Sequence, residues 1–412
     1  MQSKPHIAVV GAGIVGICSA YFLNKSGFQV TLIDKKEPGS MTSFGHACTF
    51  ADYACVPVNS PDLFKEIPSM LLRSDGPLAV DFFYVLKNLN WVTKFLQNCT
   101  TTKVNYIANS LGNLLSNASI SYDEIFSDLD VSEYIKNEEA LYLFENENEF
   151  LKASITNKIR EKNGVKIKNL SKNEILELEP NLAPVFFNGQ LFIGSRHTTD
   201  PLAVSKKIFE SFINNGGKFL KNNVENIIPN ESKVKVSFKN ENFSFDKVVV
   251  SAGSWSKNLT RKFGDDFPLD TERGYHVLFN NYELINRPLG WSQSGFYLVQ
   301  LAEGLRAAGT VEIAGLSKPE NKKRTKMIEN QARKLLPQLK EVKSTWLGFR
   351  PTMPDSLPVI GQSQKNKNII YGFGHQHIGW TLGAVTGKVI NSICNDRIPN
   401  INIKPFSPSR FN

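Results

Sequence analysis

The sequence predicts a mixed α/β protein in which a parallel sheet and a separate antiparallel sheet are built from interleaved parts of the chain. Three observations predict it. The first 34 residues read as strand, glycine turn, helix and strand, which is a βαβ unit. Short alternating strands between residues 218 and 251 form a meander that leads into a buried strand. Four strands between residues 274 and 314 are candidates for one antiparallel sheet.

The βαβ unit begins with a short apolar run over residues 6–10, which has no helical period and reads as a strand. It passes directly into the turn Gly11-Ala12-Gly13-Ile14-Val15-Gly16. An amphipathic helix over residues 17–25 follows, and then a second strand over residues 29–33 that stops at Asp34. This order is typical of a unit that binds a dinucleotide.

Each glycine of this turn has a physical role in such a unit. Gly11 permits a sharp turn, Gly13 lets the backbone approach a pyrophosphate, and Gly16 lets the helix pack close to the sheet. The free N–H groups and positive dipole of the helix N-terminus face the phosphates. Asp34 accepts hydrogen bonds from a ribose diol and argues against a 2′-phosphate. The unit predicts a bound dinucleotide, either a nicotinamide or a flavin, with an unliganded βαβ unit as the alternative.

Composition limits the class of protein. The 412 residues suffice for two domains, and no apolar run approaches the roughly 20 residues that span a bilayer. The first strand begins within about five residues, which leaves no room for a signal peptide and makes a cytoplasmic location the expectation. The net charge is +9, with Lys outnumbering Arg 36 to 12 and no cluster of Arg with aromatics, so we expect no nucleic-acid partner.

The five cysteines, at positions 18, 48, 55, 99 and 394, form no CxxC pair. Their odd number and the absence of Cys/His ligand spacing favour free thiols in a reducing compartment. The sequence contains no HExxH and no other recognisable metal site, so we expect no bound metal.

Helical periodicity predicts the first elements after the βαβ unit. Residues 77–98 carry one apolar stripe and a second aromatic line, and a further helix is expected over 104–126. We interpret the helix over 77–98 as packed between domains, with docking on a membrane surface as the alternative. That alternative would place the protein peripherally on the inner face of the cytoplasmic membrane.

The middle of the chain alternates short helices and strands. A helix over 201–214 has Asp200 as a plausible N-cap and Gly216-Gly217 as its stop. Further helices are expected over 149–163, 172–178 and 327–336. Strands are expected over 140–144, 218–228, 233–238, 242–245, 247–251, 274–280, 296–300, 305–308 and 311–314.

The tail carries a second glycine-rich turn at a helix N-terminus. A proline-punctuated stretch over 347–361 precedes a strand over 368–372. Gly372-Phe373-Gly374-His375-Gln376-His377-Ile378-Gly379-Trp380-Thr381 then opens a final helix over 382–394. Such a turn places backbone N–H groups and a positive dipole beside electron-rich flavin carbonyls, although a simple structural turn is the alternative.

Four blocks carry a family resemblance, namely residues 10–16, 42–48, 251–256 and 350–381. Their order and spacing make the chain similar to the D-amino acid oxidase-like FAD oxidoreductases, and within them to bacterial D-amino acid dehydrogenases. The first block is generic, whereas the proline-punctuated block with its downstream glycine turn is specific. The resemblance implies a Rossmann-like FAD-binding domain with a discontinuous antiparallel-sheet substrate domain.

The resemblance also divides the chain and assigns residues. The FAD-binding domain is expected to comprise residues 1–60, 145–175, 200–260 and 346–412, and the substrate domain residues 61–144, 176–199 and 261–345. Residues expected to bind FAD are Gly11, Gly13, Ile14, Val15, Gly16, Asp34, Lys35, Ser43, Gly45, His46, Ala47, Val224, Ala252, Gly253, Trp255, Gly348, Gly374, His375, Ile378, Gly379, Trp380 and Thr381.

Four residues are expected to serve catalysis. Arg350 matches the arginine that binds a substrate carboxylate, which suits a planar guanidinium, with a structural ion pair as the alternative. Tyr275 lies where the family offers an active-site tyrosine. His46 and His377 depart from the usual pattern; His46 stands where an asparagine is usual, so it is a candidate to tune the flavin, bond substrate or attach the cofactor covalently.

The resemblance implies oxidative deamination of a small amino acid, a D-amino acid above all, with D-proline-like or hydroxyproline-like imino acids as candidates. Hydride passes from Cα to flavin N5, and the imine hydrolyses to a 2-oxo acid and ammonia. A quinone, oxygen or a soluble carrier is the expected electron acceptor. The alternatives are a sarcosine or N-methyl amino acid dehydrogenase on the same fold, a non-catalytic flavoprotein and a nicotinamide-only enzyme.

Overall fold

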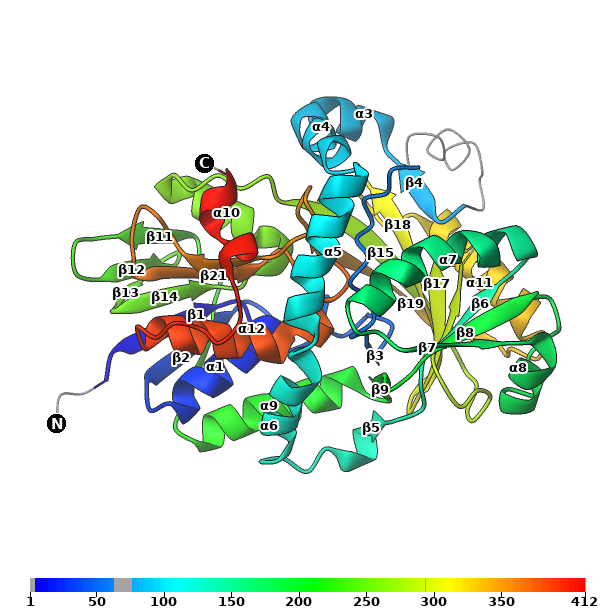
Figure 1. Cartoon of the computed structure of the whole chain (residues 1–412). Coiled ribbons are helices and arrows are strands. Elements are labelled where there is room, and N and C mark those ends of the chain that lie inside the picture. The colour runs from blue at the N-terminus through cyan, green and yellow to red at the C-terminus, as the bar shows by residue number, and fades with distance from the viewer. Residues whose placement is uncertain (1–3, 63–75, 293, 412) are drawn as a thin grey trace.

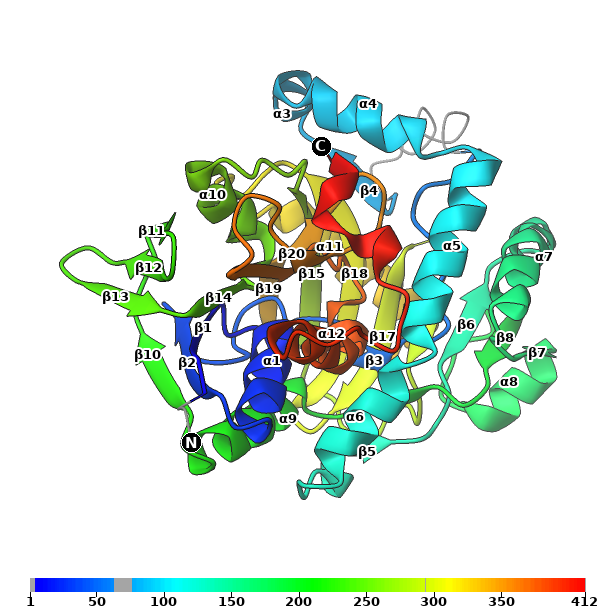
Figure 2. The ribbon, with the colours of Figure 1, turned by 60° about the vertical axis from the view of Figure 1, so that its left-hand side comes forward.

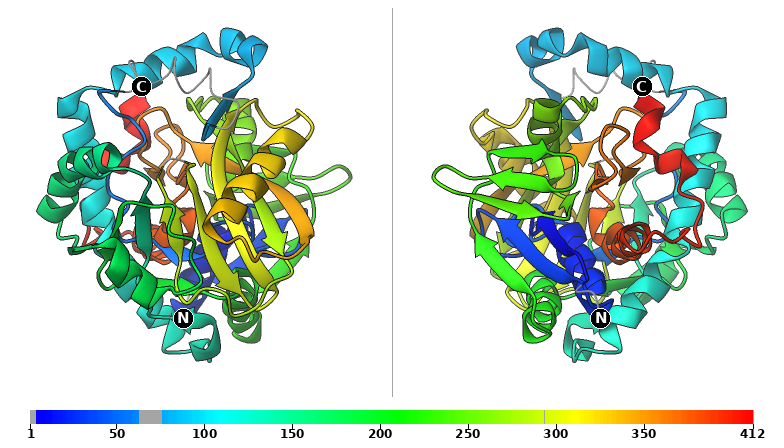
Figure 3. Two further views of the ribbon diagram at one scale, coloured as in Figure 1. Left: turned by 90° about the vertical axis from the view of Figure 1, so that its right-hand side faces the viewer. Right: turned by 90° about the vertical axis from the view of Figure 1, so that its left-hand side faces the viewer.

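The computed structural model describes residues 4–62, 76–292 and 294–411. It contains two large sheets that lie side by side, with the parallel sheet on the left of Figure 1 and a larger, mostly antiparallel sheet on the right. The left view of Figure 3 has the larger sheet in front, and the right view has the parallel sheet in front. Segments distant in sequence contribute to both halves, so the mixed α/β fold predicted from the sequence is confirmed.

The parallel sheet has six strands in the order β10-β2-β1-β14-β21-β20. All neighbours are parallel except β20, which pairs antiparallel with β21. The strands are β10 (Lys218–Lys221), β2 (Gln29–Asp34), β1 (His6–Val10), β14 (Lys247–Val250), β21 (Ile369–Phe373) and β20 (Val359–Gln362). Because β1 and β14 are neighbours, the turns after them meet at the same sheet edge.

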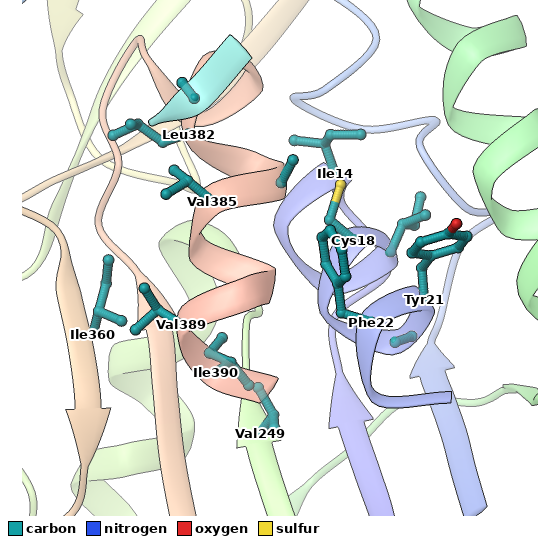
Figure 4. Close-up of a cluster of buried hydrophobic side chains, with 14 of the residues drawn as sticks. Ile14, Cys18, Tyr21, Phe22, Val249, Ile360, Leu382, Val385, Val389 and Ile390 are labelled. Atoms are coloured by element: carbon teal, nitrogen blue, oxygen red, sulfur yellow. The ribbon is translucent and has the colours of Figure 1, made fainter. Parts of the chain in front are cut away.

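Two helices, α1 (Ile14–Lys25) and α12 (Gly379–Cys394), pack together on one face of this sheet. Figure 4 shows Ile14, Cys18 and Phe22 of α1 beside Leu382, Val385 and other apolar side chains of α12. A Cβ on Gly387 would lie 2.8 Å from the Cys18 carbonyl carbon, so only glycine permits this spacing. Helix α9 (Pro201–Asn214) packs against α1, and Asp200 caps it as predicted.

The other face of the parallel sheet is covered by a small antiparallel sheet of β11 (Asn226–Pro229), β12 (Val234–Ser237) and β13 (Asn242–Phe245). These strands stand at one edge of the molecule in Figure 2. The strand predicted over 218–228 is therefore two strands, β10 and β11, in different sheets. The chain between them, residues 222–225, runs past the carboxyl end of β2 instead of continuing the strand.

The larger sheet has nine strands. Its order is β19-β15-β18-β17-β16-β6-β8-β7, and β4 pairs with β18 outside this path. They are β19 (Val342–Thr352), β15 (Asp270–Phe279), β18 (Gly304–Ile313), β17 (Phe296–Leu301), β16 (Leu289–Trp291), β6 (Leu141–Phe144), β8 (Asn188–Phe192), β7 (Ile167–Leu170) and β4 (Leu78–Val80). Helix α11 (Lys322–Leu335) buries its apolar face on β15 and β18.

The remaining elements surround the two sheets. Helices α5 (Thr101–Leu115) and α6 (Ala118–Phe126) pack on α12, and α3 and α4 lie above the sheets in Figure 1. The remaining helices and strands are α3 (Phe82–Lys87), α4 (Leu89–Gln97), α7 (Glu147–Lys162), α8 (Lys172–Leu178), α10 (Ser256–Thr260), β3 (Thr49–Phe50), β9 (Arg196–Thr198) and β5 (Ile135–Lys136). Short 3₁₀ turns cover Ser132–Tyr134, Gly253–Trp255, Arg261–Phe263, Lys404–Phe406 and Pro408–Phe411.

Some predicted helices differ from those observed. The helix predicted over 77–98 is β4 followed by two short helices, because the Asp81 side chain accepts from Tyr84 N and starts a new helix there. The helix predicted over 104–126 is broken at residues 116–117 into α5 and α6. Helix α12 begins at Gly379, three residues earlier than predicted, whereas α8 and α9 have the predicted bounds.

Two strands of the larger sheet come wholly or partly from ranges expected in the FAD-binding domain. Strand β7 lies within 145–175 and pairs with β8, and the end of β19 lies within 346–412 and pairs with β15. The division of the chain into two domains stays a prediction. The two strands predicted over 305–308 and 311–314 are one strand, β18.

None of the helices formed by residues 4–62, 76–292 and 294–411 is both long and apolar enough to cross a bilayer. The five cysteines are buried and form no disulfide among these residues.

Candidate active site

A cavity of about 930 Å³ lies between the two large sheets. Its floor is formed by the turns after β1 and β14 and by the N-terminus of α12. Its roof is formed by β15, β18 and β19 of the larger sheet. The four sequence blocks that carry the family resemblance therefore meet at one place.

The glycine turn after β1 is shaped by close backbone contacts. Gly11 has φ +106°, and a Cβ there would overlap with the Ser251 carbonyl oxygen. A Cβ on Gly16 would overlap with the Gly11 carbonyl oxygen, which explains why α1 needs glycine at that position. Gly13 is different, because its nearest neighbour would be Ser43 Oγ at 3.4 Å and its α-carbon faces the cavity.

Asp34, at the end of β2, is hydrogen-bonded to the glycine turn. Its Oδ2 accepts from Ala12 N at 2.7 Å, and its Oδ1 accepts from Lys36 N at 2.9 Å. Each carboxylate oxygen still has a free lone pair, so the side chain can also accept hydrogen bonds from a ribose diol. Lys35 follows in the cavity wall, with its Nζ 5.1 Å from the ring centre of Trp255.

The segment over residues 41–47 crosses the N-terminus of α1. Ser43 Oγ accepts from Ile14 N at 2.9 Å, so it satisfies one of the free donors of the helix. Thr42 Oγ1 donates to the Phe349 carbonyl oxygen at 3.1 Å and ties the segment to β19. A Cβ on Gly45 would overlap with the Trp346 ring, so the segment also lies directly against the larger sheet.

His46 is held neutral in a defined orientation. Its Nδ1 accepts from Cys48 N at 2.8 Å, and its ring stacks on Trp380 with 4.6 Å between centres. Burial, together with the charges of Arg306 and His276, lowers the pKa of His46 well below its usual 6.5. With Nδ1 accepting, Nε2 carries the proton, and this buried donor has no partner among the described residues.

Arg306 fixes this segment, and the sequence reasoning missed it. Its Nη1 donates to the carbonyl oxygens of Phe44 and His46 at 2.7 and 3.2 Å. His276 lies beside it, stacked on Trp346 with 5.1 Å between ring centres. Burial of a charged side chain requires partners, but the burial of Arg306 is seen only in the structure, and no local pattern in the sequence marks it.

The turn before α12 is supported by side chains that point away from the cavity. His375 Nε2 bonds to Thr386 Oγ1 at 3.0 Å, and burial lowers the pKa of His375 to about 3. Thr381 Oγ1 accepts from Ala51 N at 2.9 Å, and Ile378 packs in the helical core. Gly374 has φ +86° and lies against Met353. These residues shape the turn, while Gly379 and Trp380 line the cavity.

Most residues expected to bind FAD line the cavity. They are Gly11, Gly13, Ile14, Val15, Asp34, Lys35, Ser43, Gly45, His46, Ala47, Val224, Ala252, Gly253, Trp255, Gly348, His375, Gly379 and Trp380. Gly16, Gly374, Ile378 and Thr381 are not among the lining residues, and their contact with FAD stays a prediction. His375 lines it, but its side chain bonds to Thr386.

The residues present fit a bound flavin dinucleotide. Gly13 leaves an open cradle at the N-terminus of α1, where phosphate oxygens are favoured. Three buried polar atoms near the cavity, His46 Nε2, Ser251 Oγ and Trp380 Nε1, have no partner among the described residues. Unsatisfied buried polar groups are unfavourable, so a ligand that bonds to them is expected.

Arg350 lies in the roof of the cavity. Its Nη1 donates to the Thr310 carbonyl oxygen at 2.7 Å, and a Cβ on Gly274 would lie 2.5 Å from Nη2. The glycine therefore makes room for the guanidinium. Among the described residues, Arg350 forms no ion pair, so the structural ion pair considered as an alternative is not present there. Glu272 is its neighbour across β15 and β19.

Two titratable groups flank Arg350. Burial raises the pKa of Glu272, and the Arg350 charge opposes that rise. Burial and the Arg350 charge lower the pKa of His377 to about 4, so His377 is neutral at pH 7. Both side chains belong to residues that line the cavity. Arg350 is therefore the cation of this group, and neither Glu272 nor His377 adds a second positive charge beside it at pH 7.

Tyr275 is among the residues that line the cavity, but its hydroxyl has partners within the larger sheet and its flanking chain. The Tyr275 hydroxyl donates to Glu312 Oε2 at 2.5 Å and accepts from Asn321 N at 3.2 Å. Its ring belongs to the core beneath α11, on the other face of the larger sheet. Successive residues of a strand point to opposite faces, so these hydrogen bonds hold the hydroxyl on the side of α11, and an active-site role for Tyr275 stays a prediction.

Other cavity groups were missed from the sequence. Three tyrosines, Tyr53, Tyr142 and Tyr297, line the cavity together with Arg160. We call these three residues the tyrosine cluster. They lie on separate elements, and no local motif marks them. Arg160 lies in a helix rich in Lys, Glu and Asn, where it resembles an ordinary surface charge.

Comparison with known proteins agrees with this arrangement. The family model described as FAD dependent oxidoreductase, DAO, matches residues 6–393. The chain is 33% identical to a D-amino-acid oxidase of Bradyrhizobium diazoefficiens, with the whole of both chains covered. It is 25% identical to D-amino acid dehydrogenase 1 of Mesorhizobium japonicum over 98% of this chain and 99% of that protein.

A solved structure shares the fold. Glycine oxidase from Geobacillus kaustophilus superposes with a TM-score of 0.75 and 18% sequence identity, covering 99% of each chain. The family model spans most of the chain, and the cofactor is FAD. From its sequence, its cavity and these similarities, the protein belongs to the DAO family of FAD-dependent oxidoreductases.

Proposed function

We propose that the protein oxidises D-amino acids to the corresponding 2-oxo acids and ammonia. One observation carries the proposal: Arg350 presents an unpaired guanidinium in the roof of the cofactor cavity. A carboxylate accepts two parallel charged hydrogen bonds from such a group. The full-length relative named D-amino-acid oxidase supports an amino acid substrate.

The protein's part in this reaction is binding and orientation. Arg350 holds the carboxylate, and the Thr310 carbonyl oxygen and the Gly274 backbone fix the position of Arg350. Bound FAD supplies the two-electron oxidation that turns the amine into an imine. Because the pKa of His377 is lowered to about 4, His377 adds no positive charge beside the substrate amine at neutral pH. A neutral amine is the form that can be oxidised.

An N-methyl amino acid is a second candidate substrate, because Arg350 recognises the carboxylate and leaves the amine substituent undefined. D-proline-like and hydroxyproline-like imino acids are candidates for the same reason, because they also combine a carboxylate with a substituted amine. Turnover assays on matched D-amino acids, imino acids and N-methyl amino acids separate them by product. A 2-oxo acid with ammonia supports the proposal, whereas formaldehyde from an N-methyl substrate supports the alternative.

The electron acceptor belongs to the same proposal. We propose that a quinone, oxygen or a soluble carrier reoxidises the reduced enzyme. Rapid reoxidation in air, compared with reoxidation by a quinone analogue without oxygen, distinguishes an oxidase from a dehydrogenase. The membrane alternative for residues 77–98 has support only from exposed apolar side chains on α3 and α4, such as Phe82 and Phe83.

A further inference from the structure

A second arginine, Arg160, lines the same cavity as Arg350. It projects from α7, near the C-terminal end of that helix. Its Nη1 donates to Thr156 Oγ1 at 3.1 Å and to Asn157 Oδ1 at 3.0 Å, both of which are neutral. Its Nε is buried and has no partner among the described residues.

Most other described arginines pair with carboxylates. Arg273 contacts Glu312, Arg306 contacts Glu303 and Arg410 contacts Asp355. Among residues 4–62, 76–292 and 294–411, Arg160 forms no such pair. A partly buried cation without an anion is energetically unfavourable. Arg160 is therefore expected to bind an anionic group of a ligand.

The tyrosine cluster supplies neutral donors beside this cation. The hydroxyls of Tyr53 and Tyr297 lie 3.4 Å apart, and the Tyr53 ring stacks on Phe192 with 4.0 Å between centres. Arg160 lies over the same Phe192 ring, 5.5 Å from its centre. Burial raises the pKa of Tyr297 well above 10, so its hydroxyl keeps its proton and can donate to an anion.

The register of the larger sheet places this group relative to Arg350. Tyr297 on β17 pairs with Ala308 on β18. Ala308, Gly309 and Thr310 follow one another on β18 and all line the cavity. The Thr310 carbonyl oxygen accepts from Arg350 Nη1. Arg350 and the tyrosine cluster therefore line the same cavity.

We propose that Arg160 and the tyrosine cluster bind a second carboxylate, on the substrate side chain, so that the enzyme prefers dicarboxylic amino acids such as D-glutamate and D-aspartate. The proposal rests on the proposed function for its reaction and on Arg350 for the first carboxylate. It differs from the expected preference for small or imino acids. A neutral amide analogue would leave Arg160 without its anion, and that difference provides selectivity.

Carboxylate binding by the holoenzyme provides the test. Succinate and butyrate are matched in length and differ by one carboxylate, and their dissociation constants are measured from the change in the visible flavin spectrum. We expect succinate to bind at least tenfold more tightly than butyrate. In Arg160→Met this ratio should fall toward one, and Arg160→Lys should retain part of it. Lys158→Met, on the exposed side of the same helix, is the matched control for loss of one positive charge.

Kinetics provide the second readout. The ratio of kcat/KM for D-glutamate to that for D-glutamine should fall at least tenfold in Arg160→Met, through KM more than kcat. Equal binding of succinate and butyrate by the wild-type enzyme would overturn the proposal, as would an Arg160→Met variant with an unchanged ratio. If Arg160→Met does not fold, the wild-type preference for succinate over butyrate and for D-glutamate over D-glutamine tests the proposal.

The two proposals fail separately. If no amino acid reduces the enzyme, the proposed function is wrong, while the succinate and butyrate titrations still test the second carboxylate site. If D-alanine is oxidised but D-glutamate is not preferred over D-glutamine, the proposed function stands and the second site is rejected.

Discussion

Glu272 and Arg350 lie opposite each other on β15 and β19, in the roof of the cofactor cavity. Within the described residues no ion pair joins them. Arg350 instead donates to the Thr310 carbonyl oxygen. The guanidinium is therefore oriented by a neutral group and remains available for a carboxylate.

Replacement of Arg350 by Ala should raise the substrate KM on the order of 100-fold, because two charged hydrogen bonds are lost. Flavin content should stay at the wild-type level. Lys343→Ala, an exposed charge on the same strand, is the control and should keep the wild-type KM. Arg350→Lys should give an intermediate KM, since lysine keeps the positive charge but cannot donate two parallel hydrogen bonds to a carboxylate. An unchanged KM in Arg350→Ala would reject the substrate assignment.

Replacement of Glu272 by Gln should change how stability depends on pH. The folded state raises the pKa of Glu272 above its ordinary 4.5, so unfolding releases a proton once the pH exceeds that value. Wild-type stability therefore falls as pH rises from 4.5 through the folded-state pKa. The free energy of unfolding of Glu272→Gln, relative to wild type, should increase over that window in denaturant titrations. The exposed Glu320→Gln is the control, and a flat difference for Glu272→Gln would contradict the burial argument.

Two glycines of one turn should give different defects. Gly16→Ala places a methyl group against the Gly11 carbonyl, so we expect a loss of stability of about 1–3 kcal/mol and a lowered Tm even without cofactor. Gly13→Ala meets nothing closer than 3.4 Å, so the apoprotein should keep its Tm while flavin binding weakens. Scanning calorimetry and flavin content distinguish these results. A Gly13→Ala apoprotein as unstable as Gly16→Ala would contradict the assignment of Gly13 to the phosphates.

Buried histidines should make the protein sensitive to acid. The pKa of His197 is lowered from 6.5 to about 4 by burial, and His276 and His375 are lowered to about 3. The unfolded chain binds more protons below pH 6.5, so stability is lost as pH falls from 6.5 toward 4. Each histidine contributes a slope of up to about 1.4 kcal/mol per pH unit.

His197→Asn tests this slope without touching the cofactor cavity, since His197 bonds to the Glu138 carbonyl oxygen on a separate small sheet. As the pH is lowered from 6.5 to 4, the free energy of unfolding of His197→Asn should fall less steeply than that of wild type. Parallel curves for the two proteins would mean that His197 is protonated in the folded state.

Local patterns in the sequence predicted what depends on short-range geometry. The glycine turn, Asp34 and the final helix follow from residue spacing alone, and the structure places them around one cavity. Arg350 required a family motif, because nothing in its local sequence separates it from a structural arginine.

Residues whose role depends on tertiary pairing were missed or misplaced. Tyr275 and Gly274 are adjacent and both line the cavity, yet the Tyr275 hydroxyl bonds to Glu312 and Asn321, because the pairing of β15 with β18 and β19 decides where the side chain lies. Arg160 and the tyrosine cluster come from different elements, so only the assembled sheet brings them together. Arg306 was missed because the carbonyl oxygens that it contacts lie 260 and 262 residues away in the sequence, and no local pattern indicates such contacts.

The visible spectrum of the purified holoenzyme, recorded anaerobically during addition of paired D- and L-amino acids, tests the central claim most directly. We expect the D-enantiomer to bleach the main visible flavin band of the wild-type enzyme. The same concentration should leave the flavin of Arg350→Ala oxidised. A protein with full flavin content that no D-amino acid bleaches, or that L-enantiomers bleach equally, would contradict the proposed function.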